Sequence, residues 1–300
     1  MRRHPYLTRF GLRFRRHRLA VASGFALIVL AAGSALAPAI ETALGVDANA
    51  VNLLNRFAPP SRGHLLGTDE LGRDVLVRLA YGGRVSLTVG LAAALGSALI
   101  GTCIGLLAGY YGGRLDAFLM RFTDGVIALP FLPLLIVLAA VDLGKLGISP
   151  TIATPEQMNL VRIVVIVSLV GWTTVARLVR GNALALRQQM FIEAARAQGA
   201  GAIRIMARHI LPNLASPIIV ATTLAAGNMI LLESVLSFLG LGIQPPTPSW
   251  GNLLTNAQEL IWSSPALAFY PGMLIFATVI AFNFVGDGLR DALDPRTIQG

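Results

Sequence analysis

The chain contains long blocks of apolar residues that carry no charge. The clearest block, Val85 to Gly113, exceeds the roughly 20 residues that an α-helix needs to cross a bilayer. Only 13% of all residues are charged, against roughly 25% in an ordinary soluble domain. The short alternating runs of a membrane β-barrel are not seen in these blocks. Because a spanning helix satisfies its own backbone groups, the sequence predicts an all-α polytopic membrane protein.

Six blocks are expected to cross the membrane. The fourth has a short charge-free stretch, 163–176, so it spans only if Arg162 and Arg177 snorkel toward opposite interfaces. The expected spans are 19–40, an N-terminal anchor, and then about 85–110, 117–141, 158–179, 213–241 and 266–286, the last five forming one transmembrane domain over 85–292.

The positions of the arginines predict the orientation. Arginines crowd the residues before the first span and the 180–208 connection, and short cytoplasmic segments are the ones rich in Lys and Arg. Both termini are therefore expected in the cytoplasm, with 1–18 as a basic interfacial helix, 41–84 as an external loop and 293–300 as a tail. Further arginines in 41–84 oppose this topology, although Asp69, Glu70 and Asp74 accompany them. The net charge of +9 is read as a topology signal, which argues against nucleic acid as a partner.

A cleaved signal peptide is the alternative interpretation of the first span. Basic residues, an apolar stretch and Ala35-Leu36-Ala37 resemble its three regions. Pro38 would directly follow the cut, and the apolar stretch exceeds the 7 to 15 residues of a typical signal peptide. An uncleaved anchor is therefore expected.

The cysteine and histidine content provides no metal site. Cys103 is the single cysteine, so a disulfide framework cannot form within the chain. The four histidines fall in four separate places without metal-ligand spacing.

The 187–212 connection carries the most specific pattern. Residues 189–198 favour a short helix, and Gly199 with Gly201 permits a sharp turn. A second amphipathic turn follows, and Pro212 is expected where the next membrane helix starts. From the residues alone, an ordinary interfacial helical hairpin remains an equal alternative.

The same connection resembles the EAA loop of ABC importer permeases. Glu193-Ala194-Ala195, then Gly199, then Leu211-Pro212 follow the spacing of that loop. The general pattern has an aliphatic residue where this chain has His209. The run 208–213 is, however, similar to the peptide and nickel branch of the family, so this departure narrows the resemblance.

Three other stretches resemble the C-type permease of dipeptide, oligopeptide and nickel importers. These are 64–87, which also reads as a helix capped by Thr68 or Asp69, then 236–251 and 286–296. The resemblance covers essentially the whole chain. It implies the type I ABC importer permease fold with cytoplasmic coupling helices, in a bacterial inner membrane.

The partners that the resemblance implies are a second, B-type permease, two ATPase subunits, an external substrate-binding protein and membrane lipid. The chain itself has no G-x-x-x-x-G-K-[ST] loop, and its single lysine, Lys145, lacks that context. ATP and Mg are therefore expected on the ATPases, with no cofactor and no catalysis in this chain.

The candidate site residues fall into three groups. Glu193 and Arg196 are expected to contact the rim of an ATPase groove, and small residues to permit close approach. The ATPase-coupling group is Glu193, Ala194, Ala195, Arg196, Gly199, Ile203, His209 and Pro212, and the binding-protein group is Thr68, Asp69, Arg73, Asp74, Pro246 and Trp250.

Polar residues within the spans form the third group. Glu233 is expected to line the pathway, pair with an arginine or lie at the interface, since buried acids are costly in membranes. Asn228 shares its span, and Asp124 is expected to pair with Arg121. The glycines at near-fourfold spacing, Gly96, Gly101, Gly105 and Gly109, are expected to pack helices closely.

Two other classes of function are weighed against the permease. An ion-coupled secondary transporter would need more intramembrane acids or repeat symmetry. An intramembrane enzyme would need histidine, serine or paired aspartate within the helices. Short peptides are the favoured substrate, while nickel chelates, glutathione and antimicrobial peptides remain open.

Overall fold

The computed structural model describes residues 14–15, 17–139, 155–255 and 257–293, and the regular elements of these ranges are helices. The predicted all-α class is confirmed. In chain order the elements are α2 (Arg18–Ala35), α3 (Ala37–Leu44), η1 (Leu53–Asn55), α4 (Val75–Tyr111), α5 (Gly113–Ala128), α6 (Phe131–Ala139), α7 (Pro155–Gly171), α8 (Thr173–Leu186), α9 (Met190–Ala197), α10 (Ala202–Ile205), η3, a π-helical turn (Met206–Ile210), α11 (Leu211–Phe238), η4 (Asn252–Leu254), α12 (Ala257–Leu260) and α13 (Pro265–Leu293).

Within these described ranges, four continuous helical runs are long and apolar enough to cross a membrane. They are α2, α4, the run Ala202–Phe238 that ends in α11, and α13. A fifth results if α7 and α8, which meet at a 45° bend, form one span. The count of six spans stays a prediction because of the predicted span 117–141. It falls on two helices, α5 and α6, which are separated by Leu129 and Pro130, and its end lies outside the described residues.

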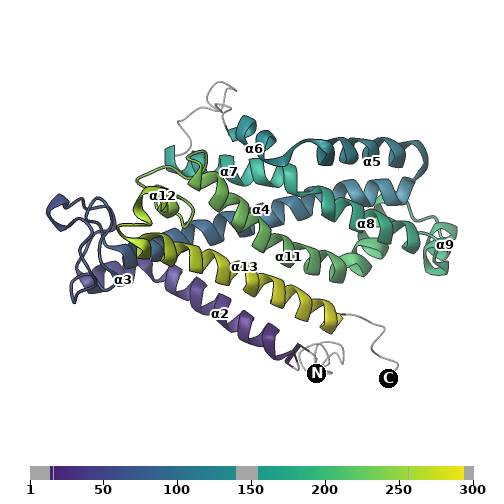
Figure 1. Ribbon diagram of the computed structural model, residues 1–300. Coiled ribbons are helices and arrows are strands. Elements are labelled where there is room, and N and C mark those ends of the chain that lie inside the picture. Colours follow the sequence, from purple (N-terminus) through teal and green to yellow (C-terminus); the bar gives the residue numbers. More distant parts are fainter. Residues whose placement is uncertain (1–13, 16, 140–154, 256, 294–300) are drawn as a thin grey trace.

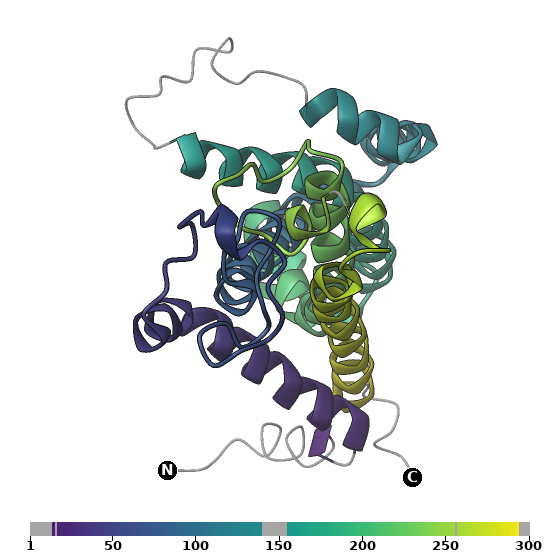
Figure 2. The ribbon, with the colours of Figure 1, turned by 60° about the vertical axis from the view of Figure 1, so that its left-hand side comes forward.

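The helices form one bundle with α4 and α11 at its centre. Figures 1 and 2 show α2 and α5 on opposite sides of the bundle, with α4 and α11 between them. The loops around η1 lie at one end, and α9 lies at the other. The first turn of α2 and the last turn of α13 approach each other, with His17 Nε2 3.9 Å from Asp291 Oδ2. The 1–18 helix and the 293–300 tail lie largely outside the described residues.

Close packing of α4 against α7 and α8 depends on the glycine stripe, as predicted. A Cβ on Gly101 would lie 2.6 Å from the Trp172 carbonyl oxygen, and one on Gly109 would lie 2.6 Å from Ala183 Cβ. Gly105 meets the backbone of Ala176 still more closely, and Gly96 meets the Ser168 hydroxyl. Each glycine therefore lets the backbones approach where a side chain would separate them.

The second span begins earlier than predicted, at Val75 instead of residue 85. Asp74 caps α4, because its carboxylate accepts a hydrogen bond from the Val77 N–H at 2.9 Å. The predicted caps, Thr68 and Asp69, are wrong, since both lie in the preceding turn. The added turns of α4 precede the predicted span, and they position the polar loop residues that come before the helix.

Two predicted continuous spans contain breaks. The first ends at Ala35, and α3 restarts with Pro38 in its first turn, where the missing N–H of proline is tolerated. The fourth bends at Trp172, so that α7 and α8 can both follow α4. These breaks depend on local packing that average hydropathy does not report.

Candidate functional site

The segment with the most specific sequence pattern folds as a short helical hairpin beyond the end of α8. Gln189, in extended conformation, precedes α9. Gly199 then adopts the left-handed conformation with φ 82°, and the Ala200 N–H donates to the Ala195 carbonyl at 3.0 Å. This is how a glycine ends a helix and satisfies its last carbonyls. The predicted helix and turn are confirmed.

The inner face of α9 fixes the hairpin to the bundle. Ile192 is fully buried and Ala195 is 8% exposed, and both pack in one core cluster with Ile205, Ile210 and residues of α8. Ala195 therefore contacts this chain's own core more than any outside surface. The burial of these apolar side chains makes the hairpin a continuation of the membrane domain.

The outer face of α9 is open. Glu193, Ala194 and Gly199 are exposed, and Ile203 on α10 is 79% exposed although it is apolar. Between α9 and α10 lies a shallow pocket of about 470 Å³, which combines a small-residue surface with a basic edge. It is lined by Phe191, Ala194, Ala195, Gln198, Ala200, Arg204, Arg208 and His209.

Arg196, unlike Glu193, contacts an aromatic side chain of this chain. Its guanidinium lies 5.5 Å from the centre of the Tyr110 ring, at the end of α4. The Arg187 side chain donates to the Tyr110 carbonyl at 3.1 Å. Sequence reasoning missed Tyr110 and Arg187, since nothing local relates them to α9. Together they tie the hairpin to the central helix.

Glu233 lies in α11 and is completely buried. Its Oε2 accepts from Ser86 of α4 at 2.8 Å, and its Oε1 accepts from Ser237 at 2.7 Å. Ser234 donates a longer bond of 3.4 Å. The predicted arginine pair is therefore wrong, and a buried carboxylate with no exposed surface neither lines a pathway nor lies at an interface. Hydroxyl donors satisfy it instead.

The same serines hold the loop that follows α11. The Trp250 N–H donates to Ser86 Oγ at 3.1 Å, and the Ile243 N–H donates to Ser237 Oγ at 3.0 Å. The indole N–H of Trp250 donates to the Leu79 carbonyl at 3.0 Å. Ser237 could have been suspected from its i,i+4 spacing to Glu233, but Ser86 lies 147 residues away and carries no such signal.

The other two polar span residues have separate surroundings. Asn228 is exposed on α11. Asp124 of α5 forms an ion pair with Arg177 of α8, so the predicted pair with Arg121 is wrong. Packing of α5 beside α8 brings these two charges together across 53 residues of sequence.

Most residues predicted to contact a binding protein are buried. Thr68, Asp69, Asp74 and Trp250 are each buried, with exposures of 8% or lower, so as predicted contacts they are wrong. Pro246 is exposed, and the Arg73 side chain is 11% exposed. These residues build the interior of the loops at this end of the bundle instead of covering their surface.

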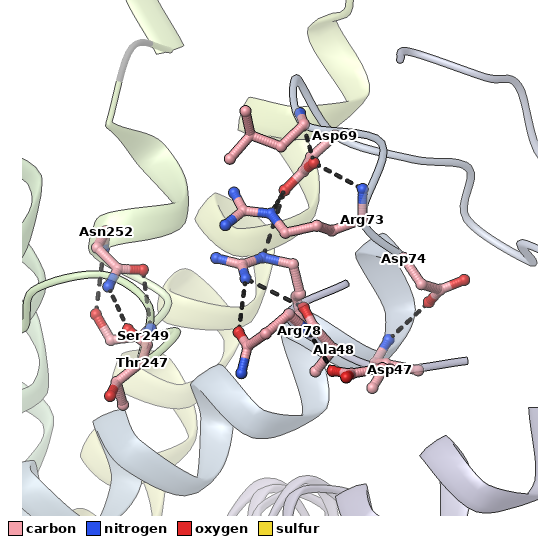
Figure 3. Close-up of polar contacts among 12 residues, drawn as sticks. Asp47, Ala48, Asp69, Arg73, Asp74, Arg78, Thr247, Ser249 and Asn252 are labelled. Carbon is pink, nitrogen blue, oxygen red and sulfur yellow. Dashed lines mark hydrogen bonds and ion pairs between the residues drawn. The ribbon is translucent and has the colours of Figure 1, made fainter. Parts of the chain in front are cut away.

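Asp69 organises the turn that precedes α4. Figure 3 shows Arg73 and Arg78 directed toward its carboxylate, at 2.7 and 3.4 Å from their Nε atoms. Asp69 also accepts from the backbone N–H groups of Leu71 and Arg73, which closes the turn. Burial raises the pKa of the neighbouring Glu70, and the charge of Asp69 adds to that increase.

Sequence reasoning did not single out the exposed leucines of the long loop that precedes α4. Leu53 and Leu54 of η1 are 61% and 97% exposed. Hydrogen bonds on both sides hold this segment, including Asn52 N–H to the Leu71 carbonyl at 2.9 Å. Exposed leucines on an ordered turn give no signal in a sequence that is apolar throughout.

Membrane-crossing helices around a packed centre, with a basic hairpin at one end and ordered loops at the other, define a multi-pass helical membrane protein. The family model described as "Binding-protein-dependent transport system inner membrane component" matches residues 101–299. The chain belongs to this family of transport permeases.

Named relatives resemble the chain over most of its length. A dipeptide transport system permease protein of Alkalihalophilus pseudofirmus is 42% identical over 245 residues, covering 82% of this chain and 76% of the relative. A glutathione transport system permease protein of Pectobacterium atrosepticum is 41% identical over 288 residues, with 96% and 90% covered. An oligopeptide transport system permease protein of Bacillus subtilis is 38% identical over 285 residues, with 95% and 88% covered.

Proposed function

We propose that this chain is the transmembrane permease subunit of an ATP-driven ABC importer for di- or oligopeptides. The observation that carries the proposal is its similarity, at about 40% identity over nearly the whole chain, to permeases of dipeptide and oligopeptide transport systems. The chain would form half of the pathway, and a second permease would form the other half. Transport, and no chemistry, would be its task.

The α9 hairpin is the proposed coupling element. It projects Glu193, Ala194 and Ile203 outward, while Ile192 joins it to the core of the bundle. Closure of two ATPase subunits around ATP and Mg would push the hairpin and, through its core contacts, α8 and α11. Arg196 on Tyr110 would extend this movement to α4.

The proposed location is a bacterial inner membrane with both termini in the cytoplasm. The arginine distribution supports this orientation, and the start of α2, the end of α13 and the α9 hairpin lie toward the same end of the bundle. The loops around η1 and 240–255 would then face the external binding protein, with Leu53, Leu54 and Pro246 as the exposed candidates for contact.

The test is ATP hydrolysis by the reconstituted complex of both permeases, both ATPases and the binding protein. Di- and oligopeptides are expected to stimulate hydrolysis and to enter proteoliposomes. A complex that transports no peptide, or that transports without its ATPases, would contradict the proposal. The second outcome would favour an ion-coupled carrier.

Glutathione is the second candidate substrate. A glutathione transport system permease protein matches 96% of this chain at 41% identity, which is as similar as the peptide permeases. Stimulation by glutathione, with no response to dipeptides of ordinary α-peptide linkage, would select it. Nickel chelates tested in the same assay would address the remaining metal-chelate alternative.

A further inference from the structure

The hydrogen bonds around Glu233 have a fixed direction. Ser86 and Ser237 each donate their single hydroxyl proton to the carboxylate, at 2.8 and 2.7 Å. Each hydroxyl oxygen then accepts a backbone N–H from the loop after α11, from Trp250 and Ile243 at 3.1 and 3.0 Å. A serine hydroxyl has one donor, so a neighbour that only accepts decides which way it points. The carboxylate orients both serines to receive the loop.

The loop is also closely fitted to the helices beneath it. A Cβ on Gly251 would lie 2.5 Å from Ser234 Cα, and a Cβ on Gly82 of α4 would lie 3.2 Å from the Ser249 backbone. The Trp250 indole is 1% exposed and packs among residues of α4 and α13. The base of the loop therefore has no room to shift while these contacts hold.

The outer part of the loop is exposed at Gln244, Pro245 and Pro246. Gln244 and Pro245 line one pocket of about 290 Å³ together with Glu70 and Arg73 of the first external loop. The two external loops thus share a surface. Its geometry depends on how the base of the second loop is held.

We propose that Glu233 is a positioning residue for binding-protein docking. By accepting from Ser86 and Ser237, it locks the Ile243–Gly251 loop onto α4 and α11 and so fixes the Gln244–Pro246 tip beside Arg73. The proposal rests on the proposed function, because it names one surface that the importer's binding protein would meet. Glu233 acts mainly through these two serines, with Ser249 of the loop as a further side-chain partner, and contacts no substrate.

A carboxylate is required because of its hydrogen-bond chemistry. In Glu233→Gln, one acceptor becomes an N–H₂ group of nearly the same size. The serine facing that group must accept from it, so its own hydroxyl proton loses the carboxylate as its acceptor. One buried O–H donor beneath the loop is then unsatisfied, which favours the open loop by roughly tenfold. Because Glu233→Gln leaves the side-chain volume nearly constant, it tests the direction of the hydrogen bonds between residue 233 and the serines.

The experiment uses the complete reconstituted complex in a Cys103→Ser background. A spin label at Gln244→Cys reports loop mobility, and binding-protein-stimulated ATP hydrolysis reports docking. Glu233→Gln, Ser86→Ala and Ser237→Ala are each expected to raise label mobility and to raise, roughly tenfold, the binding-protein concentration needed for half stimulation. Basal hydrolysis and complex assembly should stay at the parent level.

Ser97→Ala is the matched control. Ser97 is another fully buried serine of α4, but it donates to the Ser168 carbonyl of α7, at 3.3 Å, and has no bond to Glu233. It should leave mobility and stimulation unchanged. Equal losses in Ser97→Ala, or parent behaviour in all three variants, would overturn the proposal. If Glu233→Gln does not assemble, the two serine variants decide. A parent complex that no binding protein stimulates would instead contradict the proposed function.

Discussion

Glu193 and Glu233 are two carboxylates of one chain with opposite surroundings. Glu193 is exposed on the outer face of α9, as is the neighbouring Ala194. Glu233 is fully buried in α11, and three serine hydroxyls donate to it. The Glu193 side chain is therefore accessible to a partner, whereas the Glu233 side chain is hydrogen-bonded within the chain and is inaccessible.

This difference determines how each region responds to substitution. An exposed residue contributes little to folding, so its replacement changes what the protein binds. A buried polar residue belongs to a satisfied network, so its replacement changes what the chain itself holds in place. The hairpin should therefore lose coupling without losing stability, whereas the loop held by the Glu233 network should lose binding-protein stimulation and some stability.

Gly251→Val should give the largest effect. The new side chain would overlap Ser234 Cα, 2.5 Å from the Cβ position, and prevent the loop from seating. We expect a loss of about 3 kcal/mol in stability and of binding-protein stimulation. Thermal unfolding in detergent measures the first. Gly272→Ala of α13, with open space around it, is the control and should change neither.

Glu193→Lys should impair coupling while leaving stability nearly unchanged, unlike a substitution in the Glu233 region. The reversed charge would stand on the exposed outer face of α9, which is proposed to enter the ATPase groove. Substrate uptake per ATP hydrolysed should fall at least roughly tenfold, while stability changes by less than about 0.5 kcal/mol. Glu259→Lys, a charge reversal at another exposed position, on α12 at the opposite end of the bundle, should leave coupling intact. Normal coupling in Glu193→Lys would remove the hairpin from the mechanism.

Arg196→Ala should give a smaller effect. It removes the guanidinium from the Tyr110 ring, a contact worth about 0.5–1 kcal/mol at an exposed site. A double-mutant cycle with Tyr110→Leu, measured by unfolding and by coupling, should show that the two losses are not additive. Additive losses would mean that the two side chains act independently.

Asp116 should show the smallest effect, and only in its pH dependence. Hydrogen bonds from Arg180 lower the pKa of Asp116 below its ordinary value of 3.8. The carboxylate therefore stabilises the fold above pH 3.8, and this contribution, on the order of 0.5 kcal/mol, is lost as pH falls through the lowered pKa. The stability difference between parent and Asp116→Asn should shrink toward zero on acidification. A constant difference from pH 7 to pH 2 would contradict this assignment.

Local patterns made several features predictable. The α9 helix and the Gly199 turn follow from residues within one short segment, and the glycine stripe on α4 follows from helical periodicity. The presence of membrane-crossing helices follows from apolar length. In each case the determining interactions are close in sequence or repeat along one helix.

Other features required the folded chain. Asp124 pairs with Arg177 instead of Arg121, which is closer in sequence, because α5 packs beside α8. Thr68 and Trp250 look like loop residues in sequence, but tertiary packing buries them. Helix breaks at Leu36 and Trp172 likewise depend on neighbours that hydropathy averages ignore.

The sequence by itself determined that the chain is a helical membrane protein of the permease type, since charge-free length and the hairpin pattern are properties of contiguous residues. Only the tertiary structure decided what Glu233 does. Its main donor across helices, Ser86, lies 147 residues away, and the N–H groups that the serines receive come from another loop. A buried carboxylate must find donors wherever packing brings them, and that proximity exists only in three dimensions.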